Sequence, residues 1–503
     1  MTSARHRPAL RLLAALVAAA LLAVPARAQL PTLGDSADMS IAAERRLGER
    51  IARELYRDPD FIDDPVLADY VRGIWQPLLD AARARGELTP ELDDRFAWQV
   101  LLGKDRTVNA FAVPGGWLGL NLGLVSVTAT RDELASVLAH ELSHVTQRHI
   151  ARLVSQEKRQ TPWVIGAMIL GALAASRNPQ AANAVIAGSQ AAAIHGQLSF
   201  SRDMEREADR VGFGVLSQAG YQPQGFVGMF EKLQQASRLN DYGAFPYLRS
   251  HPLTTERVAD MQQRLQLIPR GAAPAPEAVL EHALMAGRAR AISANGVDGL
   301  RALASDAANL QPGAPQARAA SVLYAAALAA SRLRDQEAAF ALGQRLGKTL
   351  EGSAVGARHA RLLAAELALG VGRTDRALAL VDGKSESRAD VLLWAQARMA
   401  TGGAPEVAQR LQAWVAAQPR DATAWQLLAS SYAAQGQQLR ALRAEAEAQV
   451  AHLDYPAAVD RFKAAQDVAR RGSTGGGDYI EASIVDTRLR AVESLAREQA
   501  LER

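Results

Sequence analysis

The apolar residues near the start of this 503-residue chain form one continuous run rather than a periodic pattern. The run extends from Leu12 to Val24, follows three arginines and precedes the small residues Ala26-Arg27-Ala28. About 13 apolar residues are too few for an ordinary membrane span, and this order of segments is typical of a secretory signal peptide. We therefore predict that residues 1–28 are a signal peptide cut after Ala28. An uncleaved N-terminal anchor is the alternative.

Residues 29–90 have the apolar spacing of helices, after which the pattern changes to short strand-like runs. Residues 96–102 and 107–113 each predict a strand, and residues 117–127 predict a strand or a turn. From Thr130 onward a capping box leads into apolar residues at helical spacing. The pattern predicts a small sheet followed directly by a helix. An edge strand of such a sheet could hold an extended peptide by main-chain pairing.

Two alanine-rich helical stretches follow between residues 161 and 195. The segment 163–175 is strongly apolar but is only about 13 residues long, which is too short to span a membrane. We expect a helix that packs over the neighbouring cleft. Contact with a membrane surface, or a role as a lid, is the alternative for this segment.

The second half of the chain has a different pattern, which begins after a Pro- and Ala-rich stretch over residues 269–276. Such a composition predicts a linker. Beyond it, pairs of helices recur at close to the 34-residue tetratricopeptide period, over residues 319–350, 354–383, 389–417 and 422–451. Trp425, Leu428 and Tyr432 match the first helix of that repeat. We predict a tetratricopeptide-like solenoid over residues 277–503, with an unrelated helix bundle as the alternative. A solenoid offers a concave surface to another polypeptide.

The whole pattern predicts a mainly helical protein with a small sheet: an α+β domain over residues 29–268, then an α-solenoid. Charge adds little, because without the first 28 residues the chain has 53 basic and 53 acidic residues. This balance argues against nucleic-acid binding. The chain has no cysteine, which excludes disulfides and thiolate metal sites and suits an oxidising compartment such as a bacterial periplasm.

The most specific chemistry in the sequence is the string His140-Glu141-Leu142-Ser143-His144. On a helix, positions four residues apart share a face, so His140 and His144 can hold one zinc ion. Glu141 lies beside that ion without binding it, where a general base belongs. We predict one Zn²⁺ per chain at this site.

A catalytic zinc ion needs a third protein ligand. The segment 201–209 reads as a helix in which Glu205 and Asp209 share a face. We predict that Glu205 is the third ligand, and that Asp209 accepts the second N–H of a zinc-bound histidine. Glu207 points elsewhere on such a helix and is expected to be solvated or salt-bridged. His149 lies about 140° from His144 on a continuous helix, so we interpret it as a non-ligand.

These two motifs together resemble the gluzincin metallopeptidases that include HtpX and the CAAX prenyl proteases. The resemblance implies zinc binding by His140, His144 and Glu205, and catalysis by Glu141. The strand Asn109-Ala110-Phe111-Ala112 resembles the substrate-side strand of that family. Ser250-His251-Pro252 and Arg257 also resemble it.

In the exported branch of the family, a histidine at the place of His251 can occupy the fourth zinc position and hold the enzyme latent. A capping or loop histidine is the alternative. Arg257 is a candidate for stabilising the transition state, and the alternative is that it only pairs with an acid.

The exported branch that carries tetratricopeptide repeats implies a periplasmic zinc endopeptidase in the quality control and assembly of outer-membrane β-barrel proteins. Its clients would be unfolded or misassembled outer-membrane proteins, and the repeats would bind the outer-membrane assembly machinery. The alternative is a solenoid chaperone or scaffold in envelope assembly, with proteolysis secondary or latent.

Overall fold

The computed structural model describes residues 39–156, 201–239, 243–268, 273–471 and 478–501. The predicted signal peptide and the apolar segment 163–175 lie outside these described residues. Within them, no helix has both the length and the apolar character needed to cross a membrane.

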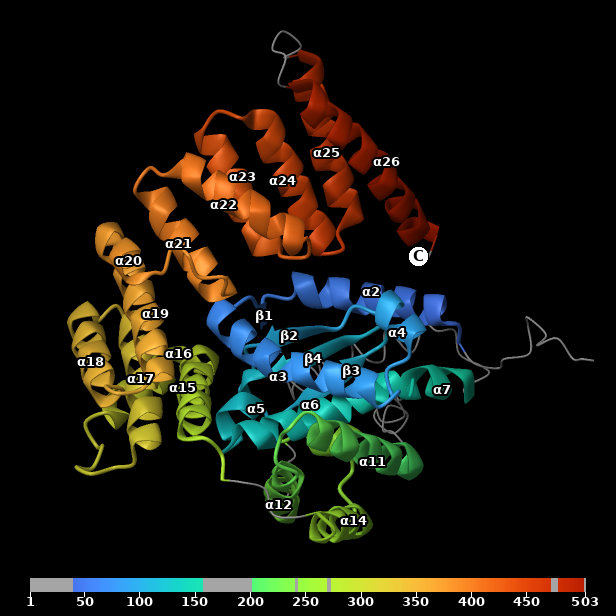
Figure 1. The fold of residues 1–503 in the computed structure, drawn as a ribbon, viewed down its shortest axis with the longest axis vertical. Coiled ribbons are helices and arrows are strands. Elements are labelled where there is room, and N and C mark those ends of the chain that lie inside the picture. The colour runs from blue at the N-terminus through green and yellow to red at the C-terminus, as the bar shows by residue number, and fades with distance from the viewer. Residues whose placement is uncertain (1–38, 157–200, 240–242, 269–272, 472–477, 502–503) are drawn as a thin grey trace, which may run out of the picture.

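A four-stranded sheet forms the centre of the first half of the chain (Figure 1). Its strands are β1 (Phe61–Ile62), β2 (Gln99–Gly103), β3 (Ala110–Val113) and β4 (Trp117–Asn121). The order is β1-β2-β4-β3, with β2 parallel to β4 and the other two pairs antiparallel. β3 is therefore an edge strand. It forms a tight hairpin with β4 through Gly115 and Gly116, both of which have positive φ.

The predicted strands are found close to their expected positions, but the third ends earlier than its apolar run. After Asn121 the chain forms a short helix, α5 (Leu122–Val127), where we had predicted strand or turn. A short apolar run does not distinguish a buried helix from a strand. The start of α5 packs closely against the 105–107 loop, because a Cβ on Gly123 would lie 2.1 Å from the carbonyl oxygen of Arg106.

Helices cover both faces of the sheet and begin at polar caps. The first three are α2 (Ile41–Arg57), α3 (Pro65–Ala84) and α4 (Pro90–Arg95), whose starts are capped by Ser40, Asp64 and Thr89. The remaining helices of the first half are α6 (Arg131–Thr146), α7 (His149–Gln156), α11 (Arg202–Gln218), α12 (Gln224–Arg238), α13 (Tyr247–Ser250) and α14 (Thr255–Gln266). α6 is the central one and packs against α3, α11, α12 and β3.

The second half of the chain consists of paired antiparallel helices, as predicted for a solenoid. Its helices are α15 (Pro276–Ser293), α16 (Gly296–Asp306), α17 (Gln316–Arg332), α18 (Gln336–Thr349), α19 (Ala354–Gly370), α20 (Thr374–Leu380), α21 (Arg388–Ala400), α22 (Ala404–Ala417), α23 (Ala422–Ala434), α24 (Gln438–Ala451), α25 (Tyr455–Arg471) and α26 (Asp478–Leu501). Each predicted helical hairpin corresponds to one pair. The fold class is confirmed as a small sheet with helices followed by a helical array.

The helical array curves around the sheet region (Figure 1). α15 packs against α5 and α3, and α21 packs against α3. Further along, Arg57 at the end of α2 pairs with Asp454 before α25 at 2.9 Å. One continuous apolar core extends from Leu67 in α3 through Leu284 in α15 to Leu393 in α21. The two halves of the chain therefore share a core.

Candidate metal centre

The helix that carries the H-E-x-x-H string starts where the sequence predicts. Thr130 accepts a hydrogen bond from the backbone N–H of Glu133 at 3.1 Å. The Glu133 side chain in turn accepts one from the backbone N–H of Ala129 at 2.6 Å, one residue before the N-cap, so the two ends of the predicted capping box hold the start of the helix. Every residue of α6 from Glu133 to Thr146 is buried. Because the helix is enclosed on all sides, the chemistry of His140, Glu141 and His144 takes place away from bulk water.

α11 brings its acidic residues onto the histidines by an unusually close approach to α6. A Cβ on Gly212 would lie 3.1 Å from the backbone of Ala139 and 3.2 Å from the Cα of His140. Only glycine lets the two helix backbones come this close without displacement. Glu205 lies about two turns and Asp209 about one turn before Gly212, and both are 1% exposed.

Four side chains from three separate parts of the chain converge on one point. His140 and His144 come from α6, Glu205 from α11, and His251 from the end of α13; their ligand atoms all lie within 4.8 Å of one another. All four side chains are buried. The structure thus places together the three predicted ligands and the histidine that we had proposed as a fourth.

The distances between these atoms match the edges of a tetrahedron around zinc. Zinc–nitrogen bonds of about 2.0–2.1 Å place tetrahedral donors roughly 3.3 Å apart. The Nε2 atoms of His140 and His144 are 3.0 Å apart, and His140 Nε2 is 3.4 Å from His251 Nδ1. Glu205 Oε1 lies 3.0 Å from His251 Nδ1 and 3.4 Å from His144 Nε2. These donors fit one closed, four-coordinate zinc site.

The charges around the site also favour a divalent cation. Glu141, Glu205 and Asp209 are buried together with one guanidinium, that of Arg257, so the carboxylates outnumber the arginine. Burial lowers the pKa of His140, but Asp209 and Glu205 outweigh it and raise this pKa to about 9. The site therefore attracts positive charge, which a metal ion would supply.

Glu141 occupies the position that a general base requires. Its side chain is fully buried, and its Oε1 accepts a hydrogen bond from the Tyr247 hydroxyl at 3.0 Å. His251 Nε2 lies 3.4 Å from the same oxygen. The other oxygen, Oε2, has no hydrogen-bond partner among the residues that the structure describes. Burial raises the pKa of Glu141, while His251 and His140 oppose this rise.

Asp209 and Arg257 lie on the side of the His140 ring that faces away from the donor cluster. Asp209 Oδ1 lies 2.9 Å from His140 Nδ1, the nitrogen on the far side of the ring from the donor cluster. Arg257 donates to both oxygens of Asp209, at 2.6 and 2.8 Å, and to the Pro252 carbonyl at 2.9 Å. Its Nη1 also forms an ion pair with Glu205 Oε2 at 2.7 Å. The guanidinium is thus directed at the two acids, as in the alternative we gave for Arg257.

Tyr247 is a residue of the site that sequence reasoning missed. It starts the one-turn helix α13, and its ring stacks on that of His251 with centroids 4.4 Å apart. The backbone N–H of His251 donates to the Tyr247 carbonyl at 2.9 Å. In the sequence, the one indication of its role is that Tyr247 lies four residues before His251, a suspected ligand. The tight turn between them places both rings against Glu141.

The expected substrate strand lies beside this turn. β3 forms one edge of the sheet and contacts α6. Just before it, Val108 donates to the Ala244 carbonyl at 2.7 Å and accepts from the Tyr247 N–H at 3.4 Å. The segment that carries Tyr247 and His251 is therefore tied by main-chain bonds to the start of the edge strand. Asn109, Ala110 and Ala112 are buried, while Phe111 is partly exposed.

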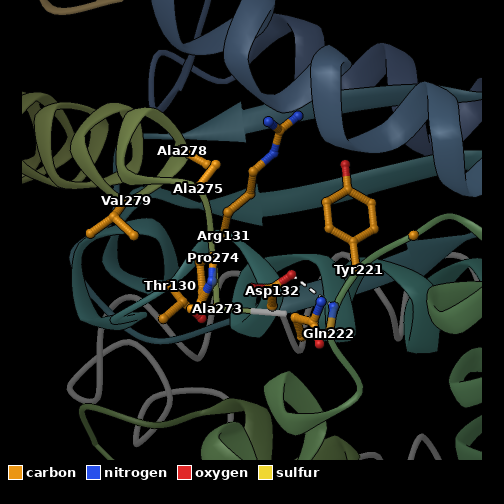
Figure 2. Close-up of a pocket in the computed structure, with 11 residues that line it drawn as sticks. Thr130, Arg131, Asp132, Tyr221, Gln222, Ala273, Pro274, Ala275, Ala278 and Val279 are labelled. Carbon is orange, nitrogen blue, oxygen red and sulfur yellow. Dashed lines mark hydrogen bonds between the residues drawn. The ribbon is translucent and has the colours of Figure 1, made fainter. Parts of the chain in front are cut away.

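A cavity of about 230 Å³ at the start of α6 lies away from the metal cluster. Figure 2 shows Arg131 and Tyr221 beside it, with Gln222 bonded to Asp132 and the first residues of α15 on the other side. Arg131 and His140 are nine residues apart on α6, which corresponds to roughly 14 Å. The cavity thus belongs to the junction between α6 and the helical array and not to the metal centre.

Comparison with known proteins agrees with this geometry. Residues 80–265 match the family model described as Peptidase family M48. The range includes all four donors of the cluster, Glu141 and Tyr247. Three relatives illustrate the similarity.

The putative beta-barrel assembly-enhancing protease of Vibrio cholerae is 33% identical over 247 residues, which are 48% of each chain. The beta-barrel assembly-enhancing protease of Escherichia coli K12 is 35% identical over 243 residues, or 47% of each chain. The mitochondrial metalloendopeptidase OMA1 of Saccharomyces cerevisiae is 27% identical over 202 residues, which are 39% of this chain and 55% of the relative.

The chain thus spans about half the length of the curated relatives it matches. The match, however, covers the whole of the metal centre, from the two histidines of α6 to the end of α13. Residues 80–265 are therefore similar to the metallopeptidase domain of family M48.

Proposed function

We propose that this protein is an exported zinc endopeptidase that acts in the quality control and assembly of outer-membrane β-barrel proteins. The observation that carries the catalytic part is the tetrahedral spacing of His140, His144, Glu205 and His251 beside the buried Glu141. The names of similar bacterial relatives, the beta-barrel assembly-enhancing proteases, support the barrel-assembly part.

In peptide hydrolysis at this site, the metal ion and the protein side chains would perform different tasks. A zinc ion would supply Lewis-acid activation of the scissile carbonyl and of the attacking water. Glu141 would accept the proton of that water on Oε2, for which the described residues offer no hydrogen-bond partner, and pass it to the leaving amine. Tyr247 holds Oε1 and so fixes the orientation of the carboxylate.

In the described arrangement the site would be latent. His251 Nδ1 stands at the fourth corner of the tetrahedron, and its ring lies against Glu141. Water and a substrate carbonyl need that same position, so His251 must move for hydrolysis to occur. We propose that displacement of the turn from Tyr247 to His251 activates the enzyme.

The substrate would bind as an extended strand on β3, at Asn109 to Ala112. Backbone pairing at an edge strand recognises unfolded chains with little sequence preference. Because Val108 is bonded to Ala244 and Tyr247, a strand that extends this edge would disturb the turn that carries His251. Unfolded or misassembled outer-membrane proteins are the clients we propose.

The remaining parts of the proposal concern location and partners. A signal peptide over residues 1–28 would direct the chain to the periplasm, where no cysteine would be at risk of oxidation. The helical array would bind the outer-membrane assembly machinery, in the manner of other helical-repeat proteins. Mass spectrometry of the N-terminus of the exported protein would show whether cleavage follows Ala28.

The test of the catalytic proposal is Glu141→Gln. This variant should retain zinc but lose peptide cleavage, because an amide cannot accept the proton of water. Zinc content and hydrolysis of an unfolded barrel protein would be measured on the same preparation. Glu133→Gln is the matched control on α6, since a glutamine preserves the capping box. Normal cleavage by the Glu141 variant would contradict the proposal.

One observation favours a second function, that of a scaffold or chaperone. If His251 closes the metal site at rest, the abundant form of the protein does not cleave peptides. An assay of barrel assembly in cells that produce only Glu141→Gln separates the two functions. Normal assembly with the inactive variant would establish the scaffold role, and failed assembly would assign the function to proteolysis.

A further inference from the structure

A second histidine lies directly behind the predicted zinc ligand His144. The Nε2 of His144 faces the donor cluster, while its Nδ1 lies 2.8 Å from Nδ1 of His149. The other nitrogen of His149, Nε2, is 3.1 Å from Glu207 Oε2, and Arg152 donates to that same oxygen at 2.8 Å. The contacts form an unbroken line from the metal centre to Arg152.

This line exists because α6 does not continue into α7. α6 ends at Thr146, and Arg148 then has a φ of 53°, in the left-handed region. The break overturns the 140° separation that a continuous helix would impose on His144 and His149, and it brings the two rings to a centroid distance of 4.9 Å. Arg148 is held in place by a hydrogen bond of 2.8 Å to the buried Glu44 of α2.

The protons along the line can be assigned by elimination. A histidine that binds a metal through Nε2 carries its proton on Nδ1, so His144 donates to His149. His149 must then accept on Nδ1 and carry its own proton on Nε2, which donates to Glu207. An imidazolium would have no acceptor for the His144 proton. One carboxylate therefore sets the tautomer of two successive histidines.

We propose that His149, Glu207 and Arg152 form a hydrogen-bonded relay that positions the metal-binding imidazole of His144 and strengthens its hold on the ion. This inference rests on the proposed zinc site. The two zinc histidines would thus be supported differently: His140 directly by the buried Asp209, and His144 through a neutral ring to a carboxylate that is 29% exposed. Glu205, Glu207 and Asp209 of α11 would all serve the same ion.

The experiment measures zinc affinity of the full-length protein by competition with a chelator. His149→Phe keeps an aromatic ring in the buried space but removes the acceptor, and should weaken zinc binding by about 10- to 100-fold. Glu207→Leu removes the last acceptor at a partly exposed position and should weaken binding in the same direction. Glu207→Gln keeps a carbonyl acceptor for His149 and should restore most of the affinity that the leucine loses.

A positioning role differs from a structural one in two further readouts. The gain in melting temperature on adding zinc, measured for each protein from its own metal-free form, should be smaller for Glu207→Leu than for the wild type. Combining Glu207→Leu with His149→Phe should add no further loss of affinity, because Glu207 acts through His149. Ser155 also lies on α7, and its hydroxyl bonds to Met39 and Ala151 and not to the relay residues. Ser155→Ala should therefore bind zinc as the wild type does.

The outcomes separate this inference from the function on which it rests. A wild-type protein that does not bind zinc would overturn the proposed function. A wild type that binds zinc, with Glu207→Leu and His149→Phe binding it equally well, would overturn the relay alone. Independent, additive losses in the double variant would also overturn it.

Discussion

At the scale of single residues, the site combines closely paired charges with one donor, His251, that is held differently from the others. Asp209, Glu205 and Arg257 are fully paired in a water-excluded space and keep the histidines in place. His251 belongs to this set by its distances, but it follows a one-turn helix, whereas the other three donors lie within long helices. It is therefore the ligand that can leave at the lowest cost.

We predict that His251→Ala raises hydrolysis of an unfolded barrel protein by roughly ten-fold, the change expected if the open form is about a tenth of the wild-type population. The three other donors should retain the ion, so zinc content should stay at one per chain. Ser250→Ala is the control, because its hydroxyl donates to the Tyr247 carbonyl at 3.3 Å and belongs to none of the four donors. Equal or lower activity of the His251 variant would argue against a latch.

At the scale of elements, the site depends on how closely α11 approaches α6. Gly212 permits this approach, and the acids of α11 reach His140 and His144 only because of it. The sheet contributes less directly, since its edge strand β3 holds the start of the turn that carries His251. Helix packing thus sets the ligand geometry, and the sheet sets the access to it.

Gly212→Val should therefore separate α6 and α11 and lower both stability and metal binding. Overpacking of this kind costs about 1–3 kcal/mol. Unfolding in urea, with and without zinc, measures both effects, and the loss should be larger with zinc present. Gly347→Ala is the control, since a Cβ there meets no atom within 4 Å; it should stabilise α18 by up to about 1 kcal/mol. If Gly212→Val matches the wild type in stability with and without zinc, the close approach of α6 and α11 is not needed for either property.

At the scale of the whole molecule, the helical array is joined to the first half of the chain by buried charges as well as by a shared core. Arg288 of α15 pairs with Asp64 at the start of α3, at 2.6 Å. Arg388 of α21 is bonded to both Asp63 and Asp421. Removal of residues 277–503 would expose the apolar residues of α3 and α5 that α15 covers, so point variants at this interface are the more informative test of its role.

Arg388→Leu should destabilise the full chain by about 3 kcal/mol, because it leaves the buried Asp421 without its cation. The midpoint of urea unfolding would measure this loss. Arg398→Leu is the matched control: its ion pair with Glu406 is exposed, and its loss should cost less than about 1 kcal/mol. Equal losses of stability in the two variants would show that the buried pairs of Arg388 contribute no more than an exposed ion pair.

The same interface should respond to acid. Burial raises the pKa of Asp63, but hydrogen bonding and charge from Arg388 outweigh this and hold the pKa below its usual value. A carboxylate with a lowered pKa in the folded state stabilises above its unfolded pKa, near 4, and loses this contribution as pH falls through the folded value. Asp63→Asn should thus be less stable at pH 7 and lose less stability than the wild type between pH 5 and 3. If the stability of Asp63→Asn and that of the wild type fall in parallel as the pH is lowered, Asp63 does not contribute to the loss of stability in acid.

The sequence by itself determined the local features of this protein. Periodicity and caps located β2, β3, α6 and the helical pairs, because these depend on neighbours within a few residues. Motif spacing was enough to select His140, Glu141, His144 and Glu205 as candidates. It also indicated His251 and Asp209, although only through resemblance and the logic of ligand support.

Only the tertiary structure decided what these residues contact. The left-handed turn at Arg148 depends on Glu44, about a hundred residues earlier, and it alone brings His149 behind His144. Arg257 faces Asp209 rather than the space where a substrate would react, because α14 packs beside α11. Tyr247 reaches Glu141 through a turn that no periodic pattern announces. Such contacts join positions far apart in the chain, and the free energy that selects them comes from packing and charge pairing in the folded interior.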